Sequence, residues 1–448
     1  MAVAYEDLAD FKGKVYRAAI DCWMADQGFS PPAGAEHTYA KFGWAPFQYH
    51  RPDENGNGGG KSVGYGDGVN CEAAMDSVRA AVDRVVDPWL SLPTGTGLGA
   101  YKDSANGSSA ILGNSRENSP ELEDSRAQVA SVASGNLKGM FVAPFVDKYC
   151  SQLLTVVHGI GDGCVILAAS YAAEEELWPA AREDVARLCF QAWEAWTKAA
   201  AEAEVANSKA ALAVVGAVAS GVAAVVTAGA ALAATTVTAA AASAAAASGV
   251  LGSVGGAASV ALAGIDREVA VNGSSFDSIL ESLSEALEGL SATIAEQDKR
   301  LNLMLSQMDD EIYSSRASYD LDYFVLADYP LTDGTMAMDP TSTSLIKQNM
   351  TRVHSSMAEA GSALGAEPGS NPSVRPSSIG VSVDGTYTAA SSLFSRLRGC
   401  LTRSTEEYAR GVALFDATVA DYFQTEEDAK ATVKQLHDAE LGVSEVTW

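Results

Sequence analysis

The chain has 448 residues and a formal net charge of −27, from 30 basic and 57 acidic side chains. Apolar residues make up 47% of it and charged residues 19%, which is enough apolar material for a large core and excludes a wholly disordered chain. An acidic chain without a basic patch is repelled by phosphate groups, so nucleic-acid binding is not expected. Docking on anionic lipid by charge alone is disfavoured for the same reason.

The N-terminal residues carry no apolar core of a secretory signal peptide, because Glu6, Asp7, Asp10 and Lys12 interrupt them. If the protein leaves the cell, it needs a route that reads another feature. The six cysteines contain no C-x-x-C pair, and no histidine lies at zinc-ligand spacing from two of them. The sequence therefore predicts no metal site, and six cysteines are too few for a disulfide scaffold.

The first half of the chain divides into two regions. Residues 1–68 are expected to be an irregular N-terminal segment, with two short amphipathic stretches before a glycine-rich run. Residues 69–209 are expected to be a helical region that contains a helix from Glu72 to about Leu92 and a long loop over about 93–122.

A long helical rhythm of apolar residues starts at Phe141 and continues towards Lys209. We expect a break in it around the glycines 159, 161 and 163, and a kink at Pro179, since proline removes a helical hydrogen bond.

The most unusual stretch is the uncharged segment, which we define as residues 210–265. Its 56 residues carry no charged side chain and are mostly Ala, Val, Gly and Leu. This length allows two helical spans of about 24 residues, each about 36 Å long, against a hydrocarbon core of roughly 30 Å. Small residues favour close contact between helices, so a hydrophobic helical hairpin is predicted.

The strength of membrane insertion differs between the two spans. The first has eight strongly apolar residues, which supply about −2 to −5 kcal/mol in total: Leu212, Val214, Val215, Val218, Val222, Val225, Val226 and Leu232. The second has five and would insert poorly alone: Val250, Leu251, Val254, Val260 and Leu262. Three interpretations remain open, namely conditional insertion, a permanently buried hairpin and a constitutive two-span membrane protein. The long charged helices on both sides argue against the last.

After the uncharged segment, residues 266–328 are expected to form a long amphipathic helix. Apolar residues alternate four and three apart from Phe276 to Ile312, a stripe about 55 Å long, and Ser274 and Asp277 form a plausible capping box. Residues 329–386 are expected to be a linker with a short helix at about 342–364. Residues 387–448 are expected to form a long C-terminal helix with an acidic tail. The predicted fold class is all-α, an elongated bundle of long helices with a central hydrophobic helical hairpin.

Two short motifs suggest chemistry only weakly. Gly60-Lys61-Ser62 resembles the end of a phosphate-binding loop, but Asn55 stands where that motif needs glycine, which favours a flexible surface loop. Asp53-x-Asn55-x-Asn57-Gly58 matches half of a calcium-binding loop, but Gly64 replaces its twelfth-position carboxylate, which favours a turn. No ordered catalytic signature appears, so we expect neither an enzyme nor a cofactor.

The pattern of long helices around one hydrophobic hairpin, over about residues 141–320, resembles the α-helical pore-forming toxins of the cytolysin A and haemolytic-enterotoxin type. This resemblance implies a rod that is soluble until the hairpin meets a membrane. It also implies assembly into a homo-oligomer there.

A second resemblance is to actinobacterial type VII (ESX) secretion substrates, which carry a W-x-G turn and a C-terminal Y-x-x-x-D/E signal. Tyr422-Phe-Gln-Thr-Glu426 fits the signal near the end of the last helix, whereas Trp89-Leu90-Ser91 departs from the turn because serine replaces glycine. The resemblance implies that Tyr422 and Glu426 form a secretion signal read by the secretion machinery.

Together these features predict a secreted, membrane-active, pore-forming protein without a cleavable signal peptide, which becomes membrane-associated after a conformational change. The alternative is a non-lytic helical scaffold or translocation component of a type VII system, in which residues 210–265 stay buried as core.

Overall fold

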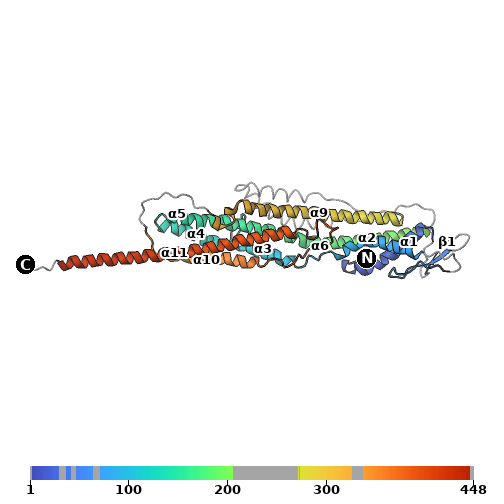
Figure 1. The fold of residues 1–448 in the computed structure, drawn as a ribbon, viewed down its shortest axis with the longest axis horizontal. Helices are drawn as coiled ribbons and strands as arrows, with labels where there is room; N and C mark the ends of the chain where they lie inside the picture. The colour runs from blue at the N-terminus through green and yellow to red at the C-terminus, as the bar shows by residue number, and fades with distance from the viewer. Residues whose placement is uncertain are drawn as a thin grey trace, which may run out of the picture.

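The computed structural model describes residues 3–29, 37–41, 47–63, 71–204, 271, 273–324 and 336–443. These residues form a long rod of helices that run along a common axis, with a small two-stranded sheet near one end (Figure 1). The prediction of an all-α, elongated bundle is confirmed. The predicted hairpin of residues 210–265 lies outside the described residues.

The central element of the rod is one nearly continuous helical stretch. It consists of α5 (Val142–Val146), a π-helical turn (Asp147–Gln152) and α6 (Leu153–Glu204). Side chains from Ile160 to Cys164 are buried on every side of α6, and most of those up to Tyr171 are buried as well. A helix that is apolar all round has to be covered all round, and α6 accordingly lies inside the bundle.

The expected break around residues 159–163 is wrong, because α6 runs through all three glycines without interruption. Each glycine instead lets a neighbour approach closely. A Cβ atom on Gly161 would lie 1.9 Å from the carbonyl oxygen of Gly113. Gly159 is in the same way packed against Tyr319, and Gly163 against Leu397. Alanine would fit at none of these positions without movement of the backbone or the core.

Pro179 also lies inside α6, which continues on both sides of it. Proline lacks an N–H, so the carbonyl group of Glu175 loses its helical partner. The chain crosses α6 closely at this point, since a Cβ atom on Gly95 would lie 3.0 Å from that carbonyl oxygen. The positive φ of Gly95, 74°, allows the crossing turn.

The half of the rod nearer the C-terminus contains two helices that begin within residues 93–122. These are α3 (Leu98–Leu112) and α4 (Pro120–Asn136). The long loop expected over about 93–122 is therefore wrong. α3 packs along α6, and α10 (Pro340–Leu364) packs on both α3 and α4. The short helix expected at about 342–364 is thus confirmed as α10.

The half of the rod nearer the N-terminus contains most of the segment expected to be irregular. Within residues 1–68 the chain forms α1 (Leu8–Asp26) and an antiparallel pair of strands, β1 (Thr38–Lys41) and β2 (Phe47–His50), with Thr38 opposite His50. The expectation of an irregular segment is therefore wrong for these elements. α2 (Glu72–Val86) packs on α1 and continues into a 3₁₀ turn, Asp87–Ser91, which contains the buried Trp89.

Two further long helices complete the rod as the apolar stripes predicted. α9 (Phe276–Ser314) packs against α6, and two 3₁₀ turns follow it at Arg316–Ser318 and Leu321–Tyr323. α11 (Tyr387–Val443) packs on α6, α9 and α10 over its first half. Its second half continues past the end of the bundle (Figure 1).

Among the described residues, one helical stretch, Val142–Glu202, is long and apolar enough to cross a membrane, with a mean hydropathy of 1.6 in its most apolar window. Inside the rod, 72% of that window is buried. Its apolar character is accounted for by its place at the centre of the bundle.

Candidate functional site

The candidate site is the junction where the described chain stops before the uncharged segment and resumes after it. α6 and α9 run antiparallel, and the end of α6 and the start of α9 meet at the same end of the rod (Figure 1). Trp196 near the end of α6 and Phe276 at the start of α9 are in direct contact. The two attachment points of the intervening chain are thus held together by described residues.

The contact between Trp196 and Phe276 combines ring packing with a hydrogen bond. The ring centroids are 6.1 Å apart with an interplanar angle of 23°, and the indole N–H donates to the carbonyl oxygen of Phe276 at 3.4 Å. Trp196 is 0% exposed and Phe276 is 5% exposed. Burial of two large aromatic side chains contributes several kcal/mol, so this contact stabilises the packing of α6 against α9.

The first turn of α9 is capped twice at this junction. Ser275 and Ser278 form a capping box, in which each side chain accepts a hydrogen bond from the backbone N–H of the other. The expected box of Ser274 and Asp277 is therefore wrong by one residue. The carboxylate of Asp26, at the end of α1, accepts a further hydrogen bond from the N–H of Phe276 at 2.7 Å.

The position of Asp26 brings a negative charge to the positive end of the α9 dipole. Desolvation raises the pKa of Asp26, the hydrogen bond from Phe276 opposes the rise, and the charge of Asp277 adds to it. Burial raises the pKa of the neighbouring Cys22 thiol as well. Three chain segments, α1, α6 and α9, therefore converge at the junction.

A shallow groove runs along α6 between the junction and the middle of the rod. Its larger part has a volume of about 370 Å³, and the described residues that line it belong to α6: Glu175, Glu176, Pro179, Ala180, Glu183, Asp184 and Arg187. A second part of about 260 Å³ shares Pro179 and Glu183 with the first and extends to Tyr5 and Glu6 near the N-terminus.

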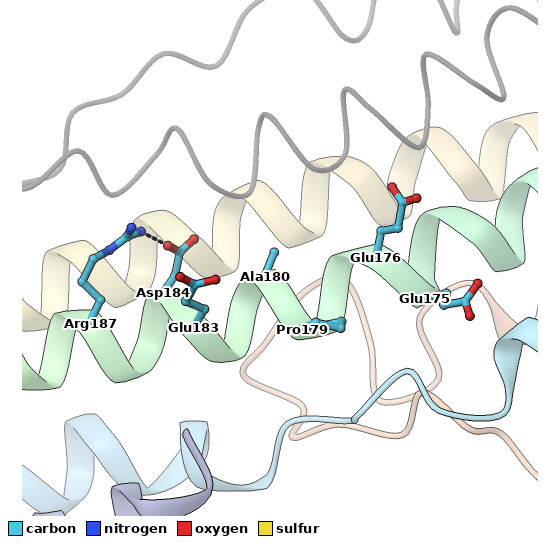
Figure 2. A pocket seen from close by; sticks show the side chains of 7 residues that line it. All are labelled: Glu175, Glu176, Pro179, Ala180, Glu183, Asp184 and Arg187. Carbon is cyan, nitrogen blue, oxygen red and sulfur yellow. Dashed lines mark ion pairs between the residues drawn. The ribbon is translucent and has the colours of Figure 1, made fainter. Parts of the chain in front are cut away.

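Ion pairs neutralise much of the acidic groove. Figure 2 shows Arg187 turned towards Asp184, with which it forms an ion pair, while Glu175 points to the other side of the helix. There Glu175 pairs with Lys102 of α3 at 2.6 Å. Among the described residues that line the larger part there is no serine, cysteine or histidine, so these residues do not combine a nucleophile with a base. The groove is a polar helix face, and no reaction is assigned to it.

The residues predicted to enter a membrane cannot be located in the structure, because all thirteen, from Leu212 to Leu262, lie outside the described residues. The predicted secretion signal can be located. Tyr422 and Glu426 lie one helical turn apart on α11, so they share a face as expected. Tyr422 is half-buried with its ring 5.3 Å from that of Phe423, and Glu426 pairs with Lys430 at 3.3 Å.

The two weak motifs are parts of one structural turn. The carboxylate of Asp53 accepts hydrogen bonds from the backbone N–H groups of Asn55 and Asn57, both at 2.9 Å. Arg79 donates to the carbonyl oxygens of Gly56 and Gly58, which ties this turn to α2.

The backbone around Gly60-Lys61-Ser62 is engaged with β2. The N–H of Gly60 donates to the carbonyl of His50 at 2.8 Å, and Ser62 forms a bridge with Tyr49. These contacts tie residues 60–62 to the strand. In the described part of the chain, no group of three His, Cys, Asp or Glu side chains is placed to hold a metal ion.

Sequence reasoning did not identify the junction. Trp196 is one of a series of apolar residues at helical spacing. Nothing in that spacing indicates a contact with Phe276, 80 residues away. The signal that could have found it is simple connectivity, since a hairpin inserted between two antiparallel helices has to begin and end at the same place.

Comparisons of the chain with protein-family models, with curated proteins and with solved structures find no match.

Proposed function

We propose that the protein is an exported, membrane-active protein that inserts its uncharged segment, residues 210–265, into a lipid bilayer, oligomerises there and forms a pore. The observation that carries this proposal is the contact of Trp196 with Phe276, which holds the described helices on either side of the segment together at one end of a rod. A segment attached in this way can enter a membrane as one unit.

The energetics of the segment support the same function. A bilayer offers no partner to a backbone N–H or C=O group, so only structures that satisfy these groups internally can cross it, and two paired helices do so. The described helices that flank the segment carry charges along their exposed faces, such as Glu281, Glu285 and Glu288 on α9. These faces are expected to stay in water.

The proposal is tested by the release of a fluorescent dye from liposomes. Wild-type protein should release the dye, and Val222→Asp should nearly abolish release. A charge at mid-span costs about 2.5–3.5 kcal/mol on insertion, which is comparable to the whole gain of the first span. Val433→Asp is the matched control, because Val433 is 65% exposed on α11 and an aspartate there meets only water.

Circular dichroism has to show that each variant folds, since an aspartate buried in the soluble form would also destabilise it. Equal release by folded Val222→Asp and wild type would contradict insertion of the segment. Absence of release by the wild type would favour the alternative function, a non-lytic helical scaffold or translocation component.

We further propose that export depends on Tyr422 and Glu426, read by secretion machinery of the type VII kind. Both side chains are half-buried on α11, and every side chain from Glu427 to Leu436 is exposed. A receptor could therefore reach this part of α11 while the rod stays folded.

A further inference from the structure

The chain between α10 and α11 crosses the middle of the rod and joins helices that are otherwise far apart in sequence. We call residues 366–386 the strap. It contacts α6 at Glu174 and Trp178 and α9 at Ser291, Asp298 and Asn302. α6 and α9 are the two helices that flank the uncharged segment, so the strap bridges them at a second point, away from the junction.

The centre of the strap is a buried ion pair. Arg375 pairs with Asp298 of α9, and the two side chains are 0% and 1% exposed. The guanidinium carbon of Arg375 also lies 4.9 Å from the centroid of the Trp178 ring on α6. The second hydrogen bond to the Asp298 carboxylate comes from the N–H of Val381, at 3.0 Å.

A second buried acid attaches the strap to α6. Glu174 is 4% exposed, and its two carboxylate oxygens accept hydrogen bonds from the hydroxyl groups of Ser373 and Thr386. Burial raises the pKa of Glu174, while the two hydroxyl groups and the charge of Arg375 oppose the rise. Two residues of the strap, Ser373 and Thr386, are thereby tied to the same residue of α6.

Further hydrogen bonds attach the strap to α9 on both sides of Asp298. The hydroxyl group of Ser291 donates to the carbonyl of Ser378 at 3.0 Å and accepts from the N–H of Gly380 at 3.2 Å. The side-chain amide of Asn302 donates to the carbonyl of Gly385 at 3.3 Å. If α9 moved away here, Arg375 would stay against Trp178 without its acid, and a buried unpaired charge is costly.

Between the strap and the junction, contacts of a different kind hold α9 in the rod. Trp178 and Trp196 are separated by about 27 Å along α6, and Phe276 and Asp298 by about 33 Å along α9, at 1.5 Å per residue. The buried side chains of α9 in this interval are apolar: Ile279, Leu283, Ala286, Leu287, Leu290 and Ile294. Apolar contacts are not directional, so other apolar surfaces, including lipid, can replace them.

We propose that the strap is the boundary of the conformational change, so that on contact with a membrane α9 separates from α6 from the junction up to the strap and no further. This inference rests on the proposed function. The half of the rod beyond Asp298 then stays folded while the half nearer the junction opens.

Hydrogen exchange of the full chain, with and without liposomes of the composition used for dye release, tests the boundary. Backbone amides of residues 276–290 and 185–200 should exchange at least tenfold faster with liposomes. Amides of residues 299–314 and 153–171 should be unchanged. Dye release accompanied by faster exchange on both sides of Asp298 would overturn the boundary alone. Absence of both release and faster exchange would overturn the proposed function and the boundary with it.

A double variant tests whether the ion pair sets the boundary. Asp298→Leu combined with Arg375→Met removes both charges but keeps apolar volume, and liposome-induced exchange should then spread into residues 299–314. Lys299→Met is the matched control, since it removes a charge from the exposed neighbouring position of α9. If the faster exchange induced by liposomes ends at the same residue in the double variant and in the wild type, the ion pair does not set the boundary.

Discussion

Trp196 and Phe276 lie 80 residues apart in sequence and pack ring against ring, with centroids 6.1 Å apart, at the place where α6 ends and α9 begins. The uncharged segment lies between them in the chain, so this contact holds together the described helices that precede and follow that segment. The functional proposal depends on that contact.

Replacement of Trp196 should destabilise the protein. Trp196→Ala should lower the free energy of unfolding by about 3–5 kcal/mol, because it removes a fully buried indole and leaves a cavity. Trp196→Phe should cost less, since it keeps a ring against Phe276 and loses the hydrogen bond. Urea denaturation followed by circular dichroism measures both. Similar denaturation midpoints for Trp196→Ala and wild type would show that the contact with Phe276 contributes little to stability.

Two glycines inside long helices should respond to alanine in opposite directions. Gly161→Ala should destabilise the protein strongly, since the new Cβ would overlap the carbonyl oxygen of Gly113. Gly289→Ala in α9 should stabilise it by about 0.5–1 kcal/mol, because no described atom lies within 4 Å of the new Cβ and alanine favours the helix. Thermal melts of the two variants compare them directly, and a stable Gly161→Ala variant would contradict the close packing of α6.

Much of the fold could be predicted from the sequence where apolar spacing is regular. The apolar stripe from Phe276 to Ile312 matches α9 to within two residues, and α11 begins at residue 387 as expected. The long helix expected over residues 266–328 is too long, because α9 ends at Ser314 and two 3₁₀ turns follow it. α3 was missed because its Gly, Ser and Asn residues are typical of loops, although Leu98, Ala105 and Leu112 are spaced seven apart and buried. The glycines of α6 were misread because a glycine required by a close neighbour looks the same in sequence as one that ends a helix.

The junction and the strap depend on tertiary contacts that no local pattern contains. Asp26 caps a helix that begins 250 residues later, and Arg375 meets its acid across 77 residues. Arginine at 375 and aspartate at 298 would be expected in water from their residue types alone.

Asp162 should make stability depend on pH. Burial raises its pKa to about 6, opposed by hydrogen bonds from the backbone and hydroxyl group of Ser115 and by the charge of Arg116. A carboxyl group whose pKa is raised by folding stabilises the fold when protonated. This contribution is complete below the ordinary pKa near 3.8 and is lost as the pH rises through about 6.

Asp162→Asn removes that dependence. The variant should gain up to about 3 kcal/mol of stability relative to wild type between pH 4 and pH 8, from a shift of about two pH units at 1.36 kcal/mol each. Urea denaturation at several pH values measures the difference. A constant difference across this range would mean that Asp162 titrates as it does in water.

Export should depend on one aromatic residue and not on its neighbour. Tyr422→Ala should abolish secretion by cells that export the wild type, while helicity is kept. Phe423→Ala is the matched control, because Phe423 is also half-buried and its ring contacts that of Tyr422. Immunoblots of culture supernatants and cell lysates give the readout. Full secretion of folded Tyr422→Ala would end the signal hypothesis.

The most direct test of membrane insertion is the environment of a fluorophore attached within the uncharged segment. The label is placed on Val222→Cys, or on Leu436→Cys as a control, in a chain with Cys71→Ser, since the other native cysteines are buried. With liposomes, the label at 222 should shift to shorter wavelength and be quenched by lipids that carry a quencher on their acyl chains. The label at 436, on a residue that is 63% exposed, should do neither. An unquenched label at 222 under conditions in which the protein is bound to the liposomes would contradict insertion.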